Sequence, residues 1–358
     1  MKYLKILLIF IPISIIGMFL KWSPTMLFIF AALAIIPLAG MIGEATEELT
    51  FYTGAKLGGF LNATFGNATE LIITFLAIKE GLFELVKSSI AGSIIGNSLF
   101  VLGASMLAGG FKYKIQTFNR RSTDTTASML LFAVIGLCIP AIFMHTVKPQ
   151  FISTNYEYLS IAVAVIMFII YILSLIFSFF THKEVFAIIP TEEELAEEGE
   201  KEEETANWSL AKCLIVLIVV TILVALESEI LVSAVEPMTK SLGISEFFVG
   251  IIIVPIVGNA AEHSTAIMMA LKNKMDVAVE IALGSSLQIV LLVLPLALFF
   301  SLFFTPMSII FNPFELVALV ASVIIANKVA SDGESNWLEG ALLIGIYIIL
   351  ALGFFILK

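Results

Sequence analysis

Apolar runs long enough to cross a lipid bilayer recur along almost the whole chain. A helix needs about 20 mostly apolar residues to span the bilayer core. Eleven segments bounded by charges, glycines or prolines reach about this length: 4–20, 25–47, 58–79, 88–109, 127–147, 153–180, 209–238, 244–271, 277–305, 308–330 and 337–357. The sequence therefore predicts an all-α polytopic membrane protein with about 11 transmembrane helices.

Composition supports this class and excludes others. Hydrophobic residues make up 59% of the chain and charged residues only 13%, whereas soluble domains are about 45–50% apolar and about 25% charged. A lipid bilayer is the expected surrounding, and neither a nucleic-acid partner nor a cofactor is expected. Segment 4–20 could be a signal peptide, but no A-x-A-like cleavage site follows it, so we assign it as the first helix.

The basic residues indicate how the chain is oriented. Cytoplasmic loops carry an excess of lysine and arginine. With the N-terminus in the cytoplasm, 13 of the 19 basic residues lie on the cytoplasmic side and six outside, namely Lys21, Lys79, Lys87, Lys148, Lys240 and Lys358. We expect a cytoplasmic N-terminus and an external C-terminus.

One acidic segment divides the chain. Residues 192–204 contain nine glutamates and lie between the sixth and seventh predicted helices. Such a charge run is usually a solvated connector, although its negative field could also attract cations or regulate transport at the cytoplasmic mouth. We expect residues 182–208 to be an acidic cytoplasmic linker.

Two similar motifs show that the halves are related. The sequence "GNATE" at 66–70 and the sequence "GNAAE" at 258–262 differ in position by 192 residues, and the same offset relates "GSI" at 92–94 to "GSS" at 284–286. Each half contributes five predicted helices, an odd number, so the second half enters the membrane from the opposite side.

The domain organisation follows from this inverted-topology repeat. We expect an extra N-terminal helix, the first five-helix repeat, the acidic linker and the second five-helix repeat, at residues 1–22, 23–181, 182–208 and 209–358.

Inverted repeats with interrupted helices are typical of secondary transporters, whose site lies near the bilayer midplane where the repeats meet. Glycines at 66 and 258, with Pro255, are expected to interrupt these helices, and freed carbonyl groups are tolerated at this depth only if they face a cavity or an ion.

The motifs supply oxygen ligands for a metal ion. In each motif the asparagine and the glutamate are three residues apart and share one helix face. The candidate ligands are Glu70, Glu262, Asn67 and Asn259. Two carboxylates with amide and carbonyl oxygens suit Ca²⁺, which takes 6–8 oxygens at about 2.3–2.6 Å.

The cost of buried charge predicts the transport mode. An uncompensated charged side chain at the bilayer centre costs from about 3 to more than 10 kcal/mol. Two facing carboxylates must therefore be filled by a divalent cation or neutralised by protons. A site that crosses the membrane carrying either Ca²⁺ or protons, and not empty, is an exchanger.

These residues give the chain a family resemblance. The motifs "GNATELII" at 66–73 and "PIVGNAAEH" at 255–263, the eleven predicted helices and the acidic segment resemble the Ca²⁺/H⁺ antiporter (cation/proton exchanger) family of the Ca²⁺/cation antiporter superfamily. The resemblance implies that Glu70 and Glu262 bind Ca²⁺ and protons in turn, that the broken helices contribute carbonyl oxygens, and that the second and seventh helices move to alternate access.

Further residues are weaker candidates. Polar side chains that could line the site are Asn97, Gln288, Ser93, Ser285 and His263; helix–helix hydrogen bonding or packing is the alternative for each. His263 is also a candidate pH sensor beside the site. Glutamates that could form an ion path to the site are Glu44, Glu47, Glu48, Glu227, Glu229 and Glu236, with solvated helix-end charge as the alternative for the first three.

Alternative functions remain open at this point. A sodium-coupled or broad divalent-cation exchanger would use the same scaffold, and a passive cation channel is a different class. An intramembrane enzyme is not expected, because the motifs lack the partners that hydrolysis needs. The compact ends favour a prokaryotic plasma (inner) membrane. The sequence does not decide whether the chain forms a homo-oligomer.

Overall fold

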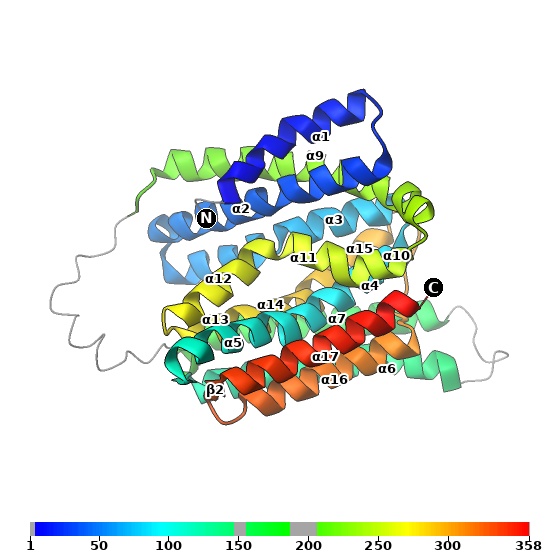
Figure 1. The fold of residues 1–358 in the computed structure, drawn as a ribbon. Coiled ribbons are helices and arrows are strands. Elements are labelled where there is room, and N and C mark those ends of the chain that lie inside the picture. Colours follow the sequence, from blue (N-terminus) through cyan, green and yellow to red (C-terminus); the bar gives the residue numbers. More distant parts are fainter. Residues whose placement is uncertain (1–3, 147–154, 187–205, 358) are drawn as a thin grey trace.

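The described part of the chain is helical apart from two short strands (Figure 1). The computed structural model describes residues 4–146, 155–186 and 206–357. Within them, eight helices are long and apolar enough to cross a membrane, and the bent pair Glu246–Gly258 and Ala260–Leu271 makes a ninth. The predicted all-α polytopic class is confirmed.

The first half of the chain contains four of the eight described helices that are long and apolar enough to cross a membrane. Its described elements are η1 (Leu4–Ile9), α1 (Phe10–Phe19), α2 (Pro24–Phe65), α3 (Ala68–Lys79), α4 (Phe83–Ile95), η2 (Gly96–Val101), α5 (Leu102–Tyr113), β1 (Ile115–Thr117), α6 (Arg120–Thr146), α7 (Asn155–Ile176), η4 (Phe177–Thr181) and η5 (Lys183–Val185). Here η1 and η5 are 3₁₀ turns, while η2 and η4 are π-helical.

The second half is divided more finely. Its described elements are α9 (Leu210–Leu242), α10 (Glu246–Phe248), η6 (Val249–Ile253), α11 (Val254–Gly258), α12 (Ala260–Leu271), α13 (Met275–Val279), η7 (Glu280–Gly284), α14 (Ser285–Gln288), η8 (Ile289–Val293), α15 (Leu294–Ser301), α16 (Pro313–Ala330), β2 (Glu334–Asn336) and α17 (Trp337–Ile356). The stretches η6, η7 and η8 are π-helical.

The predicted helices agree with these elements except at some boundaries. The first is a short helix of η1 and α1, and the second and third are joined through α2, which is kinked at Gly54 (φ 76°). The ninth ends at Ser301, not at 305, and the hydroxyl of this serine accepts a hydrogen bond from the Met307 amide in the following loop. The tenth begins at Pro313, not at 308, because Asn312 and Glu315 form a capping box that fixes the helix start.

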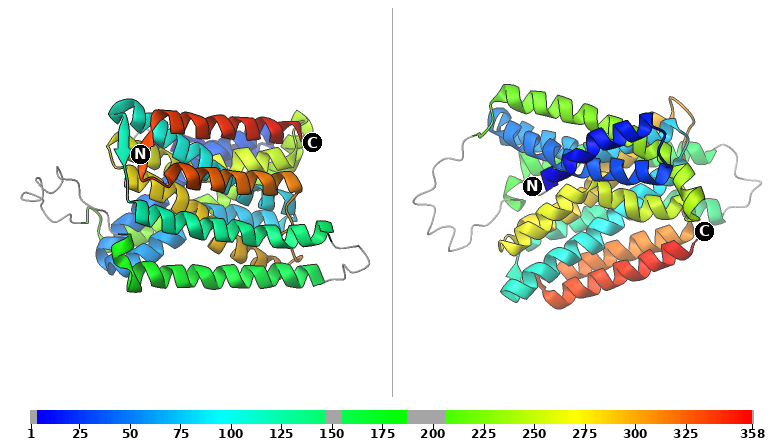
Figure 2. Two further views of the ribbon diagram at one scale, coloured as in Figure 1. Left: turned by 90° about the horizontal axis from the view of Figure 1, so that it is seen from below. Right: turned by 45° about the horizontal axis from the view of Figure 1, so that its top comes forward.

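The long helices run roughly along one direction, as expected for a bundle that crosses a membrane (Figures 1 and 2). The helices α2 and α9 lie side by side at one edge with α1 against them, whereas α5, α16 and α17 form the opposite edge. The strands β1 and β2 pair antiparallel, with Gln116 opposite Ser335, and so join the end of α5 to the start of α17.

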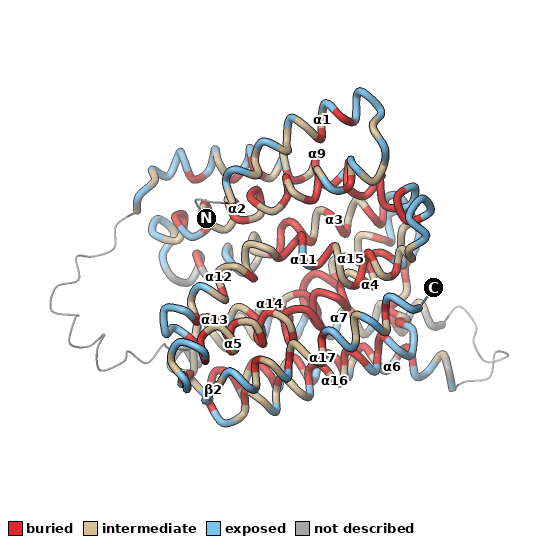
Figure 3. Tube along the Cα trace, viewed as in Figure 1, coloured by how far each residue is buried: buried red, intermediate tan, exposed pale blue. Residues whose placement is uncertain are grey.

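The centre of the bundle is where the broken elements of both halves meet. Buried residues concentrate there, while many large apolar side chains on the outer helices are exposed, as lipid contact requires (Figure 3). Close approach is possible at Gly92 of α4, where an added Cβ atom would lie 2.0 Å from the carbonyl oxygen of Ile251. The division into an N-terminal helix, two repeats and a linker stays a prediction, and linker residues 187–205 lie outside the described residues.

Candidate functional site

Both Gly-Asn motifs break a helix in the same way. Asn67 precedes α3 with φ −96° and ψ 14°, and Asn259 precedes α12 with φ −96° and ψ 8°. The axes on either side of Asn259 differ by 60°. Each glutamate therefore lies in the first turn of a new helix, and α3 and α12 run in opposite directions (Figure 1). A helix N-terminus favours a carboxylate, and the carbonyl end of the preceding helix faces the same gap.

Each glycine of the motifs lies against the glutamate of the other half. A Cβ atom on Gly258 would lie 2.8 Å from Oε1 of Glu70, and one on Gly66 would lie 3.5 Å from Oε1 of Glu262. The two carboxylates are therefore brought together, each against the backbone break of the opposite half. At Gly258 an added methyl group would collide with the carboxylate, whereas at Gly66 the distance to Glu262 is an ordinary van der Waals contact and the close neighbour is the carbonyl oxygen of Asn62, at 2.8 Å.

The asparagines of the motifs also reach across to the other half. Neither side chain caps its own helix. Instead, Nδ2 of Asn67 donates to Oε1 of Gln288 at 2.5 Å, and Nδ2 of Asn259 donates to Oγ of Ser93 at 3.3 Å and to the Pro255 carbonyl at 3.0 Å. Four of the predicted site residues are thus joined pairwise between halves.

A chain of hydrogen bonds leads from His263 to Glu262. Oγ of Ser285 donates to Oε2 of Glu262 at 2.7 Å, and Nδ2 of Asn97 donates to Oγ of Ser285 at 3.2 Å. Nε2 of His263 lies 3.0 Å from Oδ1 of Asn97, and its ring packs edge-on against Phe100. His263 therefore bonds an amide, not a carboxylate, although it follows Glu262 in sequence.

Glu70 has a different environment. The side chain is 9% exposed, and its Oε1 atom has no hydrogen-bond partner among the described residues. Neither Glu70 nor Glu262 forms an ion pair with a basic residue of the described chain. A buried acceptor without a donor is costly, so this oxygen is suited to receive a proton or a cation.

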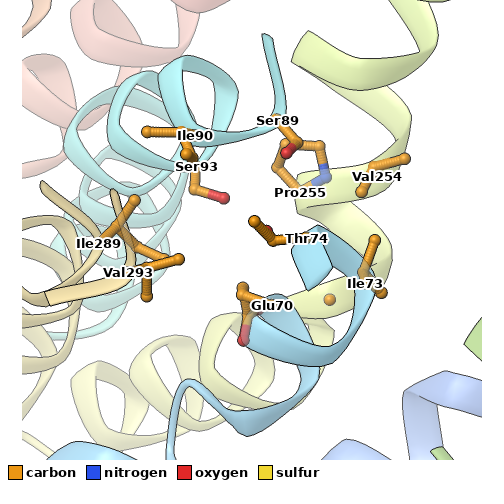
Figure 4. A pocket seen from close by; sticks show the side chains of 11 residues that line it. Glu70, Ile73, Thr74, Ser89, Ile90, Ser93, Val254, Pro255, Ile289 and Val293 are labelled. Carbon is orange, nitrogen blue, oxygen red and sulfur yellow. The ribbon is translucent and has the colours of Figure 1, made fainter. Parts of the chain in front are cut away.

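A small cleft lies beside Glu70 (Figure 4). Its polar lining beyond the carboxylate comes from Thr74, Ser89 and Ser93, and its apolar lining includes Pro255. The lining residues of α3 and α4 lie between the carboxylate and the α3–α4 turn, on the side predicted to be external. Sequence reasoning missed Thr74 and Ser89. They lie one helical turn from Glu70 and Ser93, and this spacing could have indicated them.

Of the three glutamates on α2 that were proposed for an ion path, two have partners in the described chain. Glu44 pairs with Nζ of Lys5 at 3.0 Å. Glu48 accepts hydrogen bonds from the backbone amides of Asn207 and Trp208 and from the side chain of Asn207. Glu47 is exposed.

The residues proposed for the outer path lie on α9. Glu236 pairs with Lys240 at 2.5 Å, and Glu229 is exposed. Glu227 is fully buried, and its carboxylate contacts Ser14 of α1. None of the six lies among the residues that line the cleft beside Glu70. Their role as an ion path stays a prediction.

Comparison with known proteins identifies the family. Residues 23–180 and 212–356 match the family described as "Sodium/calcium exchanger protein". The chain belongs to this family. It is 48% identical to a Ca²⁺/H⁺ antiporter of Aphanothece halophytica over 98% of this chain and 95% of that protein. It is 44% identical to the Ca²⁺/H⁺ antiporter ChaA of Bacillus subtilis over 97% of both chains. The chain is therefore a member of the Ca²⁺/H⁺ antiporter branch of the Ca²⁺/cation antiporter superfamily, as its motifs predicted.

Solved structures agree with this placement. The native structure of YfkE matches with a TM-score of 0.83 and 41% identity, covering 99% of this chain and 100% of that one. The H⁺/Ca²⁺ exchanger CAX matches with a TM-score of 0.70 over 99% of this chain and 92% of that one, but at 12% identity, which shows the fold alone. As a member of this family, the chain is an integral multi-pass membrane transporter and not an enzyme.

Proposed function

We propose that this chain exchanges Ca²⁺ for H⁺ by alternating access, with Glu70 and Glu262 binding Ca²⁺ and protons in turn. The observation that carries the proposal is the reciprocal arrangement of the two carboxylates, each in the first turn of a broken helix and against the glycine of the other half. The names of the bacterial relatives, Ca²⁺/H⁺ antiporters, support the same pair of ions.

The charge of the site explains the exchange. Two carboxylates in a low-dielectric interior, without a basic partner in the described chain, repel each other strongly when both are ionised. Ca²⁺ cancels both charges, and protons can do the same. The empty ionised site has the highest energy, so the transporter changes its access only when the site is loaded.

The neighbouring oxygens complete a hard-ligand site. Asn67 and Asn259 lie at the helix breaks with their amides held between the halves, so that their oxygens and the adjacent backbone carbonyls are the further ligands we propose for Ca²⁺. Ser285 holds Glu262, and Asn97 joins Ser285 to His263. In this proposal Asn97, Ser285 and His263 orient the carboxylate and do not bind the ion.

Ca²⁺ flux with imposed gradients tests the coupling ion. The protein in liposomes is loaded with ⁴⁵Ca²⁺, and a pH step or a sodium gradient is applied separately. We expect flux to follow the pH step and to ignore sodium. Flux driven by sodium and insensitive to pH would establish the sodium-coupled alternative, and flux that needs no counter-ion would establish a channel.

Localisation is part of the same proposal. Bacterial relatives align over nearly their full length, and we propose a bacterial plasma membrane with the N-terminus in the cytoplasm. With this orientation the cleft beside Glu70 faces outward.

A further inference from the structure

A second buried carboxyl group lies away from the exchange site. Glu227, in the middle of α9, is 0% exposed, and so is Ser14 of α1. Oγ of Ser14 lies 2.7 Å from each carboxyl oxygen of Glu227 and 2.8 Å from the carbonyl oxygen of Ile11. These are the only hydrogen bonds of the Glu227 side chain in the described chain, and α1 belongs to neither predicted repeat.

The number of hydrogens available at this contact favours a protonated Glu227. A serine hydroxyl has one hydrogen, but Ser14 is at hydrogen-bond distance from two acceptor groups, the Ile11 carbonyl and the Glu227 carboxyl. If Glu227 were ionised, the single hydroxyl hydrogen of Ser14 would have to serve all three short O···O contacts, whereas a protonated carboxyl supplies a second hydrogen. If Glu227 is a protonated acid, it donates to Ser14, and Ser14 donates to Ile11. Both distances are those of normal O–H···O hydrogen bonds.

The surroundings offer no compensating charge. The charged residues with described side chains on the elements packed against α9 are Glu44, Glu47, Glu48, Glu70, Lys79 and Glu246, and those on α9 itself are Lys212, Glu229, Glu236 and Lys240. In the described chain, none of them is hydrogen-bonded or ion-paired to Glu227. Helix α1 has no charged residue. An ionised carboxylate held by one hydroxyl at this depth is strongly disfavoured.

We propose that Glu227 is a proton-binding site distinct from the Glu70–Glu262 site, and that its bound proton joins α1 to α9. The proton supplies the second hydrogen of the Ile11–Ser14–Glu227 chain. Its loss would leave a buried charge and only one hydrogen, that of the Ser14 hydroxyl, which would then be drawn from the Ile11 carbonyl to the carboxylate. Because α9 packs along α2, the position of α1 on this helix pair then depends on whether Glu227 carries its proton.

Infrared spectroscopy of the full-length protein tests this proposal. Saturating Ca²⁺ keeps Glu70 and Glu262 ionised under the proposed function, so they do not contribute to the carbonyl band of protonated carboxylic acids at neutral pH. We expect a component of this band to persist in Ca²⁺ and to be lost in Glu227→Gln. An unchanged band in this variant would overturn the proposal.

A second variant keeps the test decisive if Glu227→Gln does not fold. Ser14→Ala removes the acceptor of the proposed bond, so the same component is expected to shift to higher frequency. Ser228→Ala is the matched control, because the buried Ser228 hydroxyl has no partner in the described chain, and the band should not move. Identical bands in the Ser14→Ala variant and the wild type would contradict the proposal. The infrared readout does not depend on Ca²⁺ flux. The proposal for Glu227 can therefore fail while Ca²⁺/H⁺ exchange is confirmed, and it can hold while exchange is refuted.

Discussion

At the scale of single residues, the site depends on two carboxyl groups in unlike surroundings. Glu262 receives a hydrogen bond from Ser285, whereas the Oε1 atom of Glu70 has no donor in the described chain. The two motifs are similar in sequence, but the hydrogen-bond partners of their glutamates differ. We infer that the two glutamates contribute unequally to binding, with Glu262 preoriented and Glu70 free to turn towards an ion or a proton.

Removing either carboxylate tests their shared role. Glutamine retains the size of glutamate and resembles the protonated acid, but it cannot cancel the charge of Ca²⁺. We expect Glu70→Gln and Glu262→Gln each to lower Ca²⁺ flux by more than the roughly 10–100-fold that loss of an outer partner of a metal ligand costs. Flux of ⁴⁵Ca²⁺ in liposomes, with size-exclusion chromatography to show folding, is the measurement. A variant with full activity would contradict the assignment of that residue.

The glycine of the second motif controls the position of Glu70. In Gly258→Ala the new Cβ atom would lie 2.8 Å from Oε1 of Glu70, so the carboxylate must turn away. We expect the KM for Ca²⁺ to rise by roughly 10- to 100-fold, with little change in thermal stability, because the displaced group is the end of a side chain. In the control Gly345→Ala, nothing lies within 4 Å of the added methyl group, and KM should stay the same. Equal KM values for both variants would exclude this role of Gly258.

At the scale of helices, the fold brings the halves together through close backbone contact. Helix α4 crosses η6 at Gly92, where there is no space for a side chain. Four residues later, Gly96 begins the π-helical stretch η2 and has open space around it. The π-helical stretches η2 and η8 flank the site from the two halves, which is a common position for such distortions.

Gly92 and Gly96 provide a matched pair of variants for measuring the effect of close packing on stability. In Gly92→Ala the added methyl group would be 2.0 Å from the backbone carbonyl of Ile251, so a whole segment must shift. We expect a loss of about 1–3 kcal/mol, typical of overpacking, seen as a lower Tm in detergent. Gly96→Ala should leave Tm unchanged or raise it, since alanine favours helix. A Tm for Gly92→Ala equal to that of the wild type would show that α4 and η6 separate without cost.

At the scale of the whole molecule, the two breaks lie on helices that run in opposite directions, so the site can face either side of the membrane by a similar movement. The small cleft beside Glu70 lies on the α3–α4 side of the site. At the other end, Leu271 at the end of α12 accepts hydrogen bonds from Lys112 and Tyr113 of α5. These contacts hold the ends of α5 and α12 together.

The orientation in the membrane can be tested directly. Ser241 and Lys272 are exposed and lie at opposite ends of the bundle. In intact cells, a membrane-impermeant maleimide should label Ser241→Cys and should reach Lys272→Cys only after lysis. The wild type, with Cys138 and Cys213, provides the background. The reverse pattern would place the N-terminus outside and the Glu70 cleft towards the cytoplasm.

The sequence by itself determined the class of the protein, the two helix breaks and the central residues of the candidate site. Apolar runs of this length are compatible only with lipid, and a glycine–asparagine pair within such a run disfavours an unbroken helix. Both features depend on neighbouring residues and can therefore be recognised in the sequence. The repeated motif predicted that the two glutamates lie close together, because halves that are related in sequence place equivalent residues at equivalent positions of the fold.

Only the tertiary structure decided which partners these residues have. The contact of Gly258 with Glu70, the chain from His263 through Asn97 and Ser285 to Glu262, and the burial of Glu227 against Ser14 all join residues more than 20 positions apart. Such contacts depend on how helices cross, and side-chain spacing along one helix carries no information on its neighbours. For the same physical reason, the sequence could place Glu227 only as a possible member of an ion path, whereas packing reveals it as a buried acid held by a helix outside the repeats.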